Sequence, residues 1–215
     1  MIVVSVFLAF LLNTPMPMTT PMAVEHLVTE AITSDSLEAS RAPLIPFLEE
    51  IEDAANEHHI PAALIAAIVQ EESAFNEWAE KSETTYERNA RVRREARRWS
   101  CLHRGIPSYR TELLDRARSM GPMQVMGEIA RAQGFQERYL SALFLPQNSI
   151  EQGALLLRHL LDRYHRDTLA AISAYNQGPA RRHHGVFENS RYVYRVSIAW
   201  RAYKKLFSTH LNLSK

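Results

Sequence analysis

The sequence has only one cysteine, Cys101, among its 215 residues. A single thiol excludes any disulfide within the chain, so oxidation cannot stabilise this fold. No base or motif close to Cys101 indicates a reactive nucleophile. We therefore expect an inert thiol that packs inside the protein.

Glycine is scarce and net charge is almost absent. The seven glycines are spread thinly, mostly at expected turns, and none forms a loop of the kind that cradles phosphate. The 25 Lys and Arg residues nearly balance the 24 Asp and Glu residues, giving a formal net charge of +1. This balance excludes a global attraction to nucleic acid or acidic membranes. The length suits one compact soluble domain with a short extra segment.

The longest apolar run covers residues 2–12 and is too short to span a bilayer comfortably. A Pro-rich stretch ending in a small residue follows, which predicts a signal peptide over residues 1–23 although no Lys or Arg precedes the run. Residues 24–42 resemble a linker, and the folded domain is predicted over residues 43–215. The alternatives are an uncleaved anchor and a start codon assigned too far upstream. We expect an exported protein of the periplasm or cell envelope, without a stable membrane span after signal removal.

Apolar residues recur at helical spacing through most of the domain, while no segment shows strand alternation or a hairpin signal. The fold class is therefore predicted to be all-α. Asn148 or Ser149 is the expected N-terminal cap of the helix predicted within 145–167. Asp167 or Thr168 is the expected cap of the helix predicted within 167–179. The patterns occupy residues 43–59, 61–73, about 80–118, 145–167, 167–179 and 189–207.

The segment of about 80–118 is an arginine-rich helical insertion. Its six closely spaced arginines repel one another, so their face must be solvated or bound to anions. The simpler interpretation is a solvated face, and the functional one is contact with an anionic wall polymer or a partner protein. Nucleic acid is disfavoured because few aromatic side chains are available for stacking. The arginines are Arg88, Arg91, Arg93, Arg94, Arg97 and Arg98.

Two adjacent glutamates end the helix predicted over 61–73. Adding three and four to Val69 and Ile68 gives position 72, so Glu72 continues the apolar stripe. Glu71 lies about 100° around the helix, toward the polar flank. A carboxyl group on an apolar face has a raised pKa and can remain protonated near neutrality, as a general acid for glycosidic cleavage requires. A buried structural ion pair is the competing interpretation.

Three short motifs follow one another in a distinctive order: "ESAFN" at 72–76, "SMGPMQVM" at 119–126 and "AYNQGP" at 174–179. With the final "RYVYRV" at 191–196, the set resembles the lysozyme-like catalytic domain of soluble lytic transglycosylases over about residues 43–207. The insertion resembles a branch of that family with extra residues between the acid and the Met-Gln loop. The resemblance implies an all-helical, lysozyme-like fold that needs no cofactor.

The resemblance also implies a reaction on the β-1,4 bond between N-acetylmuramic acid and N-acetylglucosamine in peptidoglycan glycan strands. Glu72 would protonate the glycosidic oxygen and then take the proton of the muramoyl C6 hydroxyl, leaving a 1,6-anhydro ring. A hydrolytic muramidase is the nearest alternative. A non-catalytic wall-binding component of secretion or phage machinery is the other.

Residues of the substrate cleft are assigned by the same resemblance. The substrate-binding set would be Gly121, Met123, Gln124, Tyr175, Asn176 and Tyr192. Pro122 replaces the family's leucine, which fixes one backbone torsion and removes a donor. Gly127 and Ile129 stand where the family has a proline and a threonine.

The family's usual serine has two candidates here, Ser82 and Ser119, which the sequence does not separate. A metal site is not expected, because the adjacent histidines of each pair, at 58–59 and 183–184, cannot converge on one ion.

Overall fold

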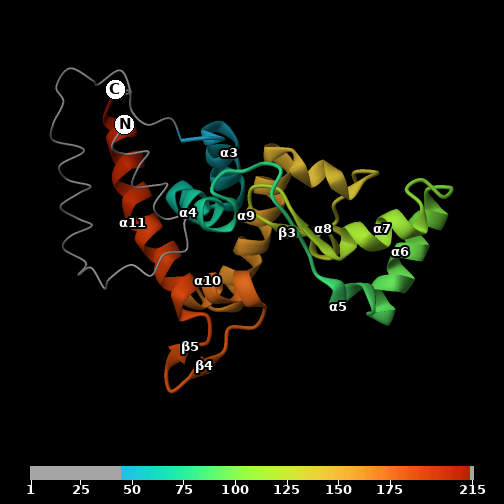
Figure 1. Ribbon diagram of the computed structural model, residues 1–215. Helices are drawn as coiled ribbons and strands as arrows, with labels where there is room; N and C mark the ends of the chain where they lie inside the picture. The colour runs from blue at the N-terminus through green and yellow to red at the C-terminus, as the bar shows by residue number, and fades with distance from the viewer. Residues whose placement is uncertain (1–44, 214–215) are drawn as a thin grey trace. The chain divides into compact units, whose positions relative to one another are not determined.

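The computed structural model describes residues 45–213, so the predicted signal peptide (1–23) and linker (24–42) lie outside the described residues. The chain is mostly helical, with a few short strands, which confirms the predicted fold class (Figure 1). Within residues 45–213, no helix is both long and apolar enough to cross a membrane.

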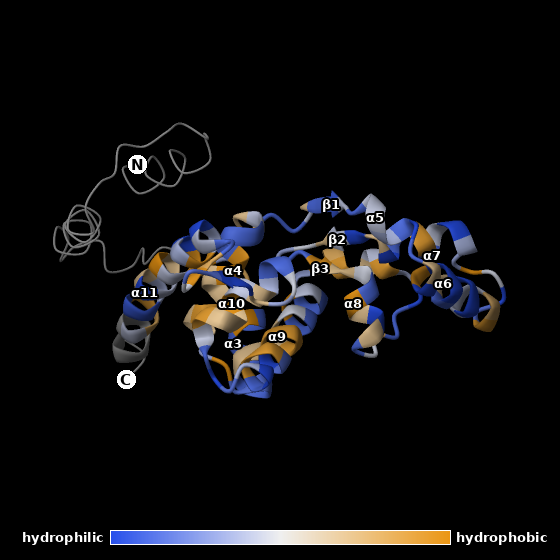
Figure 2. Ribbon diagram, turned by 90° about the horizontal axis from the view of Figure 1, so that it is seen from below, coloured by the Kyte–Doolittle hydropathy of each residue, from blue (hydrophilic) through white to orange (hydrophobic). Residues whose placement is uncertain are grey.

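Helix α4 (Ala62–Ser73) is the centre of the core. Residues 63–69 are all buried, because the segment is built almost entirely of Ala, Ile, Leu and Val. Burial thus extends all round the first two turns and is wider than the predicted stripe. The helix packs mainly against α11 (Ser190–Leu213), beside which it lies in Figure 1, and against α3 (Leu48–His58). The hydropathy colouring shows this apolar centre in α4 and α10 (Figure 2).

Helices α9 (Pro146–Arg163) and α10 (Thr168–Gln177) pack against each other next to this centre. Asp167 caps α10 by accepting a hydrogen bond from the Ala170 backbone N–H, as one of the two expected caps. The expected cap of α9 is wrong. Pro146 occupies the first turn, which places Asn148 and Ser149 inside the helix, where their side chains bond other segments.

Two small antiparallel sheets were not predicted from the sequence. Their strands have two or three residues, which is too short for an alternating pattern to be recognised. The first sheet has the order β1-β2-β3, and the second is a hairpin of β4 and β5. The strands are β1 (Glu80–Ser82), β2 (Arg118–Met120), β3 (Val125–Met126), β4 (Arg182–His183) and β5 (Val186–Phe187).

The insertion between β1 and β2 forms three helices around a small apolar cluster of Val92, Ala96 and Leu113. All six arginines of the predicted cluster are exposed. Cys101, which was expected to be packed, is also exposed, so that prediction is wrong. It lies on α6 about 40° around the helix from Arg97 and about 60° from Arg98, away from the buried stripe. The helices are α5 (Thr84–Glu87), α6 (Ala90–Leu102) and α7 (Tyr109–Arg116), and α8 (Gly127–Ala132) and the 3-10 helix η1 (Leu140–Phe144) follow β3.

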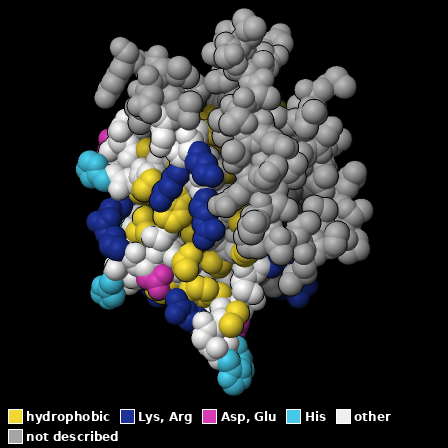
Figure 3. Space-filling view, turned by 90° about the vertical axis from the view of Figure 1, so that its left-hand side faces the viewer, with side chains coloured by type: hydrophobic (Ala, Val, Ile, Leu, Met, Phe, Trp, Pro, Cys, Tyr) yellow, Lys and Arg dark blue, Asp and Glu magenta, His cyan; other side chains and the backbone are white. Residues whose placement is uncertain are grey.

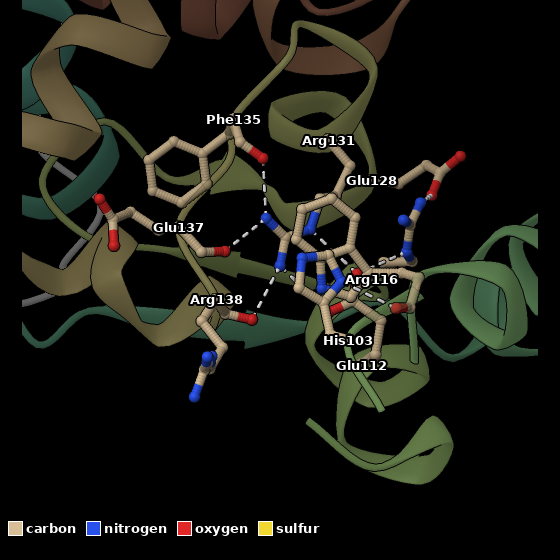
Figure 4. Close-up of polar contacts among 9 residues, drawn as sticks. His103, Glu112, Arg116, Glu128, Arg131, Phe135, Glu137 and Arg138 are labelled. Carbon is tan, nitrogen blue, oxygen red and sulfur yellow. Dashed lines mark hydrogen bonds and ion pairs between the residues drawn. The ribbon is translucent and has the colours of Figure 1, made fainter. Parts of the chain in front are cut away.

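A buried ionic network joins the insertion to α8 (Figure 4). Glu112 accepts hydrogen bonds from Arg116 and Arg131, and Arg116 also bonds Glu128. The guanidinium of Arg131 lies over the Trp99 ring at 3.6 Å. Two carboxylates and two guanidiniums make the network neutral, which is the condition for keeping charges buried.

Basic side chains are not confined to the insertion. Figure 3 views the side on which α11 lies in Figure 1, and shows Lys and Arg side chains standing among hydrophobic ones. Lys204 of α11 lies 4.2 Å from the Trp200 ring centre in such a contact. The charges on this face are therefore dispersed over apolar surface.

Candidate active site

Glu72 lies in the last turn of α4, immediately before the chain leaves the helix. Ser73 ends the helix, and Ala74 and Phe75 both have left-handed backbone conformations, with φ of 51° and 63°. This abrupt end turns the chain toward β1 and leaves the Glu72 side chain facing α11.

Tyr192 of α11 donates a hydrogen bond to Glu72 Oε1 over 2.6 Å. The pKa of Glu72 is raised to about 7, mainly by burial and to a lesser extent by the nearby charge of Glu71, while the Tyr192 hydrogen bond opposes the rise. Glu72 can therefore hold a proton close to neutrality. Because Oε1 accepts from Tyr192, Oε2 is the oxygen that can present this proton.

Glu71 has a different environment. It forms an ion pair with Arg195, one turn beyond Tyr192 on α11, and its side chain is 13% exposed. Burial raises the pKa of Glu71, while the charge and hydrogen bond of Arg195 lower it. The two glutamates are both partly buried, so the helical phase alone did not separate them as sharply as expected. Their partners do, because only Glu71 faces a cation at contact distance.

The loop between β2 and β3 depends on Gly121. Its φ of 77° favours glycine, and a Cβ there would lie 2.0 Å from the Leu143 carbonyl oxygen. The Gly121 carbonyl accepts from the Gln124 backbone N–H at 3.0 Å, which closes a tight turn around the buried Pro122. Gly121 is thus required by the backbone of this loop.

Met123 is fully buried in this loop and holds it against two helices. Its backbone N–H donates to Ser149 Oγ of α9, and its carbonyl accepts from Tyr175 Oη of α10 at 2.9 Å. Gly153 of α9 leaves room for the Met123 side chain, since a Cβ there would lie 2.5 Å from Sδ. Met123 and Tyr175 therefore position the loop from within.

Gln124 uses its side-chain amide to close the loop onto the segment after α4. Nε2 donates to the carbonyls of Ala79 at 2.8 Å and Gly121 at 3.0 Å. The Ala79 carbonyl also accepts from the Gly121 backbone N–H at 2.9 Å. The Nε2 group of the Gln124 amide therefore holds the loop in place.

Asn176 is exposed at the end of α10, and a network that the sequence did not predict orients its amide. Asn189 Nδ2 donates to Asn176 Oδ1 and to the Ser173 carbonyl, while Asn189 Oδ1 accepts from Ser173 Oγ at 2.7 Å. Asn176 Oδ1 is thereby engaged, which leaves Nδ2 as the group that Asn176 presents. Asn189, directly before α11, would read from sequence as a helix cap, so only three-dimensional contacts identify this role.

The two serine candidates lie on neighbouring strands, Ser82 on β1 and Ser119 on β2. In the register, Ser119 is opposite Lys81 and Ser82 is opposite Arg118. Neither serine hydroxyl has a contact that marks it as part of the site. In the described residues, no trio of His, Cys, Asp or Glu is arranged to hold a metal ion.

The elements that carry these residues meet around one carboxyl group. Burial and the charge of Glu72 raise the pKa of Tyr175 well above its usual value, and Tyr192 is affected in the same way. The charge of Lys81, on β1, lowers the pKa of Glu72. The structure therefore brings Glu72, Tyr175 and Tyr192 together, with the loop of Gly121, Met123 and Gln124 held against Tyr175. The close arrangement suits proton donation to a bound oxygen.

A lytic transglycosylase, Slt, from Pseudomonas aeruginosa, solved as an inactive mutant, is similar with 19% identity and a TM-score of 0.47. That similarity covers 87% of this chain and 27% of the solved one. No curated protein gave a significant match. The family profile described as Transglycosylase SLT domain matches residues 49–192, which include every residue of the candidate site. The chain therefore belongs to the Transglycosylase SLT domain family.

Proposed function

We propose that the protein is a peptidoglycan lytic transglycosylase in which Glu72 is the catalytic acid and base. The observation that carries the proposal is a carboxyl group with a pKa of about 7 whose Oε1 is held by Tyr192. An acid with this pKa is half protonated at neutral pH, which is near the optimum for proton transfer.

The proposed reaction needs a single carboxyl group. Glu72 Oε2 gives its proton to the glycosidic oxygen as the bond from the muramoyl C1 to that oxygen breaks. The carboxylate then takes the proton of the muramoyl C6 hydroxyl as the C6 oxygen bonds to C1. Glu72 therefore ends protonated again. Tyr192 supports the carboxylate between these steps by donating to Oε1.

A hydrolytic muramidase needs a second carboxylate that activates water or attacks the sugar. Glu71 is the nearest acid along the chain, but it is the adjacent residue on the same helix and is ion-paired with Arg195. This pairing disfavours Glu71 as a base and favours the 1,6-anhydro product over the hydrolytic one.

Product analysis tests the reaction. We expect purified sacculi treated with the protein to release muropeptides that carry 1,6-anhydro ends and no new reducing ends, as measured by chromatography with mass spectrometry. Reducing muramic acid ends as the main product would replace the transglycosylase with a muramidase. If the intact chain released no muropeptide at all, the proposal of a wall-binding component would take its place.

The pH dependence of activity follows from the environment of Glu72. Because the acid must be protonated, kcat/KM should decline above about pH 7. Tyr192→Phe removes a hydrogen bond that lowers the pKa of Glu72, so the decline should move to higher pH. The rate should also fall, because the carboxylate loses its donor. The measurement is turbidity clearing of sacculi across a pH series.

Tyr194→Phe is the matched control, since this tyrosine lies on the same helix but is 57% exposed. Its pH profile should equal that of the wild type. A Tyr192→Phe profile that moved to lower pH would contradict the proposed role of the hydrogen bond.

A further inference from the structure

Trp78 is a large aromatic residue that the structure leaves unusually exposed. Its exposed fraction is 67%, although it belongs to a segment with a fixed backbone. The Trp78 backbone N–H donates to Asn76 Oδ1 at 3.0 Å, and the Ala79 N–H donates to the Asn76 carbonyl at 3.2 Å. On this ordered turn the exposed indole presents a flat apolar face that a ligand can cover.

The Trp78 ring is held in place by Phe144 of η1. The two ring centres are 5.7 Å apart with planes inclined by 32°. Such a tilted pair is favourable and restricts the Trp78 side chain. Phe144 is partly buried, so Trp78 is backed by the fold on one side and open on the other.

The pair lies beside the loop of the candidate active site. Ala79, the residue after Trp78, accepts hydrogen bonds from both Gly121 and Gln124. Leu143, the residue before Phe144, places its carbonyl directly against Gly121. The chain neighbours of both rings therefore contact the same glycine, so the Trp78–Phe144 pair lies beside this loop.

We propose that Trp78, supported by Phe144, is a stacking platform for a sugar ring of the glycan strand, next to the bond that Glu72 acts on. This inference rests on the proposed function. A sugar ring has an apolar C–H face that matches an indole in size, and a pre-positioned indole loses little freedom on binding. The position beside the Gly121 loop favours a glycan over a protein partner or a second copy of the chain.

Binding of peptide-free glycan strands tests the platform. Glu72→Gln, in the full chain, should hold the strands without cleavage, and calorimetry should then give their Kd. Adding Trp78→Ala should weaken binding about tenfold, equal to roughly 1.4 kcal/mol. Adding Trp78→Phe instead should restore most of the affinity, because an aromatic face remains.

Tryptophan fluorescence gives a second readout that depends on location. The chain has three tryptophans, and Trp99 and Trp200 are only partly exposed. Glycan strands should shift the emission of Glu72→Gln, and the shift should disappear when Trp78→Phe is added while binding persists.

An unchanged Kd in the Trp78→Ala double variant would overturn the platform. The platform would also be overturned if the sole effect of Trp78→Ala were a loss of self-association, measured by sedimentation. The proposed function fails separately, if the protein with intact Glu72 binds the strands through Trp78 but cleaves no sacculi.

Discussion

Glu72→Gln should lower the rate of sacculus cleavage by about a thousandfold, since general acid–base catalysis contributes roughly 10²–10⁴-fold. Glutamine keeps the shape of the side chain and can still accept from Tyr192 at the position of Oε1. It cannot give a proton to the glycosidic oxygen or receive one from the C6 hydroxyl. The loss should therefore appear in kcat, measured by release of muropeptides, while the affinity for glycan strands is retained.

Glu71→Gln is the matched control for this experiment, because it makes the same change one residue away. It removes the ion pair with Arg195 and a charge that raises the pKa of Glu72. We expect a loss of less than about tenfold and a decline of activity that begins at lower pH. If Glu71→Gln abolished cleavage and Glu72→Gln did not, the roles of the two residues would have to be exchanged.

The sequence predicted α4 well because a run of strong helix formers follows Pro61 and ends before the turn at Ala74. The sequence also placed Glu72 on the apolar face of this helix, and in the structure its side chain is partly buried. The partner of Glu72 lies 120 residues away on α11, and no local pattern encodes such a contact. Tyr192 was assigned through the resemblance alone, since by itself a tyrosine near a buried stripe reads as core.

Local preferences failed where long-range contacts won. Ser149 suits a helix cap by residue type, yet its hydroxyl accepts from the Met123 backbone 26 residues earlier. Asn189 precedes α11 and also suits a cap, yet it bonds Ser173 and Asn176. In both cases a side chain of a type that suits a helix cap instead bonds a residue of the candidate site.

The arginines also show that local sequence patterns do not predict contacts between distant segments. Charge repulsion correctly predicted that the clustered arginines of the insertion are exposed. Nothing in the sequence distinguishes them from Arg116 and Arg131, whose side chains are 6% and 2% exposed. Burial of a guanidinium depends on carboxylates, and in this network each arginine takes one from another helix: Arg131 from Glu112 of α7 and Arg116 from Glu128 of α8.

Arg131→Met should destabilise the fold by about 3–5 kcal/mol, the usual effect of removing one partner from a buried ion pair. Arg131 donates to both carboxylate oxygens of Glu112 and to the carbonyls of residues 135, 137 and 138. Methionine fills part of the volume but satisfies none of these acceptors. At roughly 2–4 °C per kcal/mol for a domain of this size, Tm should fall by about 10 °C, measured by calorimetry.

Arg158→Met is the control, because Arg158 pairs with Asp162, whose side chain is 53% exposed. An exposed pair contributes about 0–1 kcal/mol, so Tm should change little. The Arg131 variant should also lose activity on heating before the wild type does, because α8 follows β3 and hence the Met123 loop directly. If Arg131→Met melted like the wild type, Arg116 alone would be sufficient to neutralise Glu112. The insertion would then be joined to the loop of Gly121, Met123 and Gln124 by the β1–β2 pairing and the apolar packing of its helices, without help from Arg131.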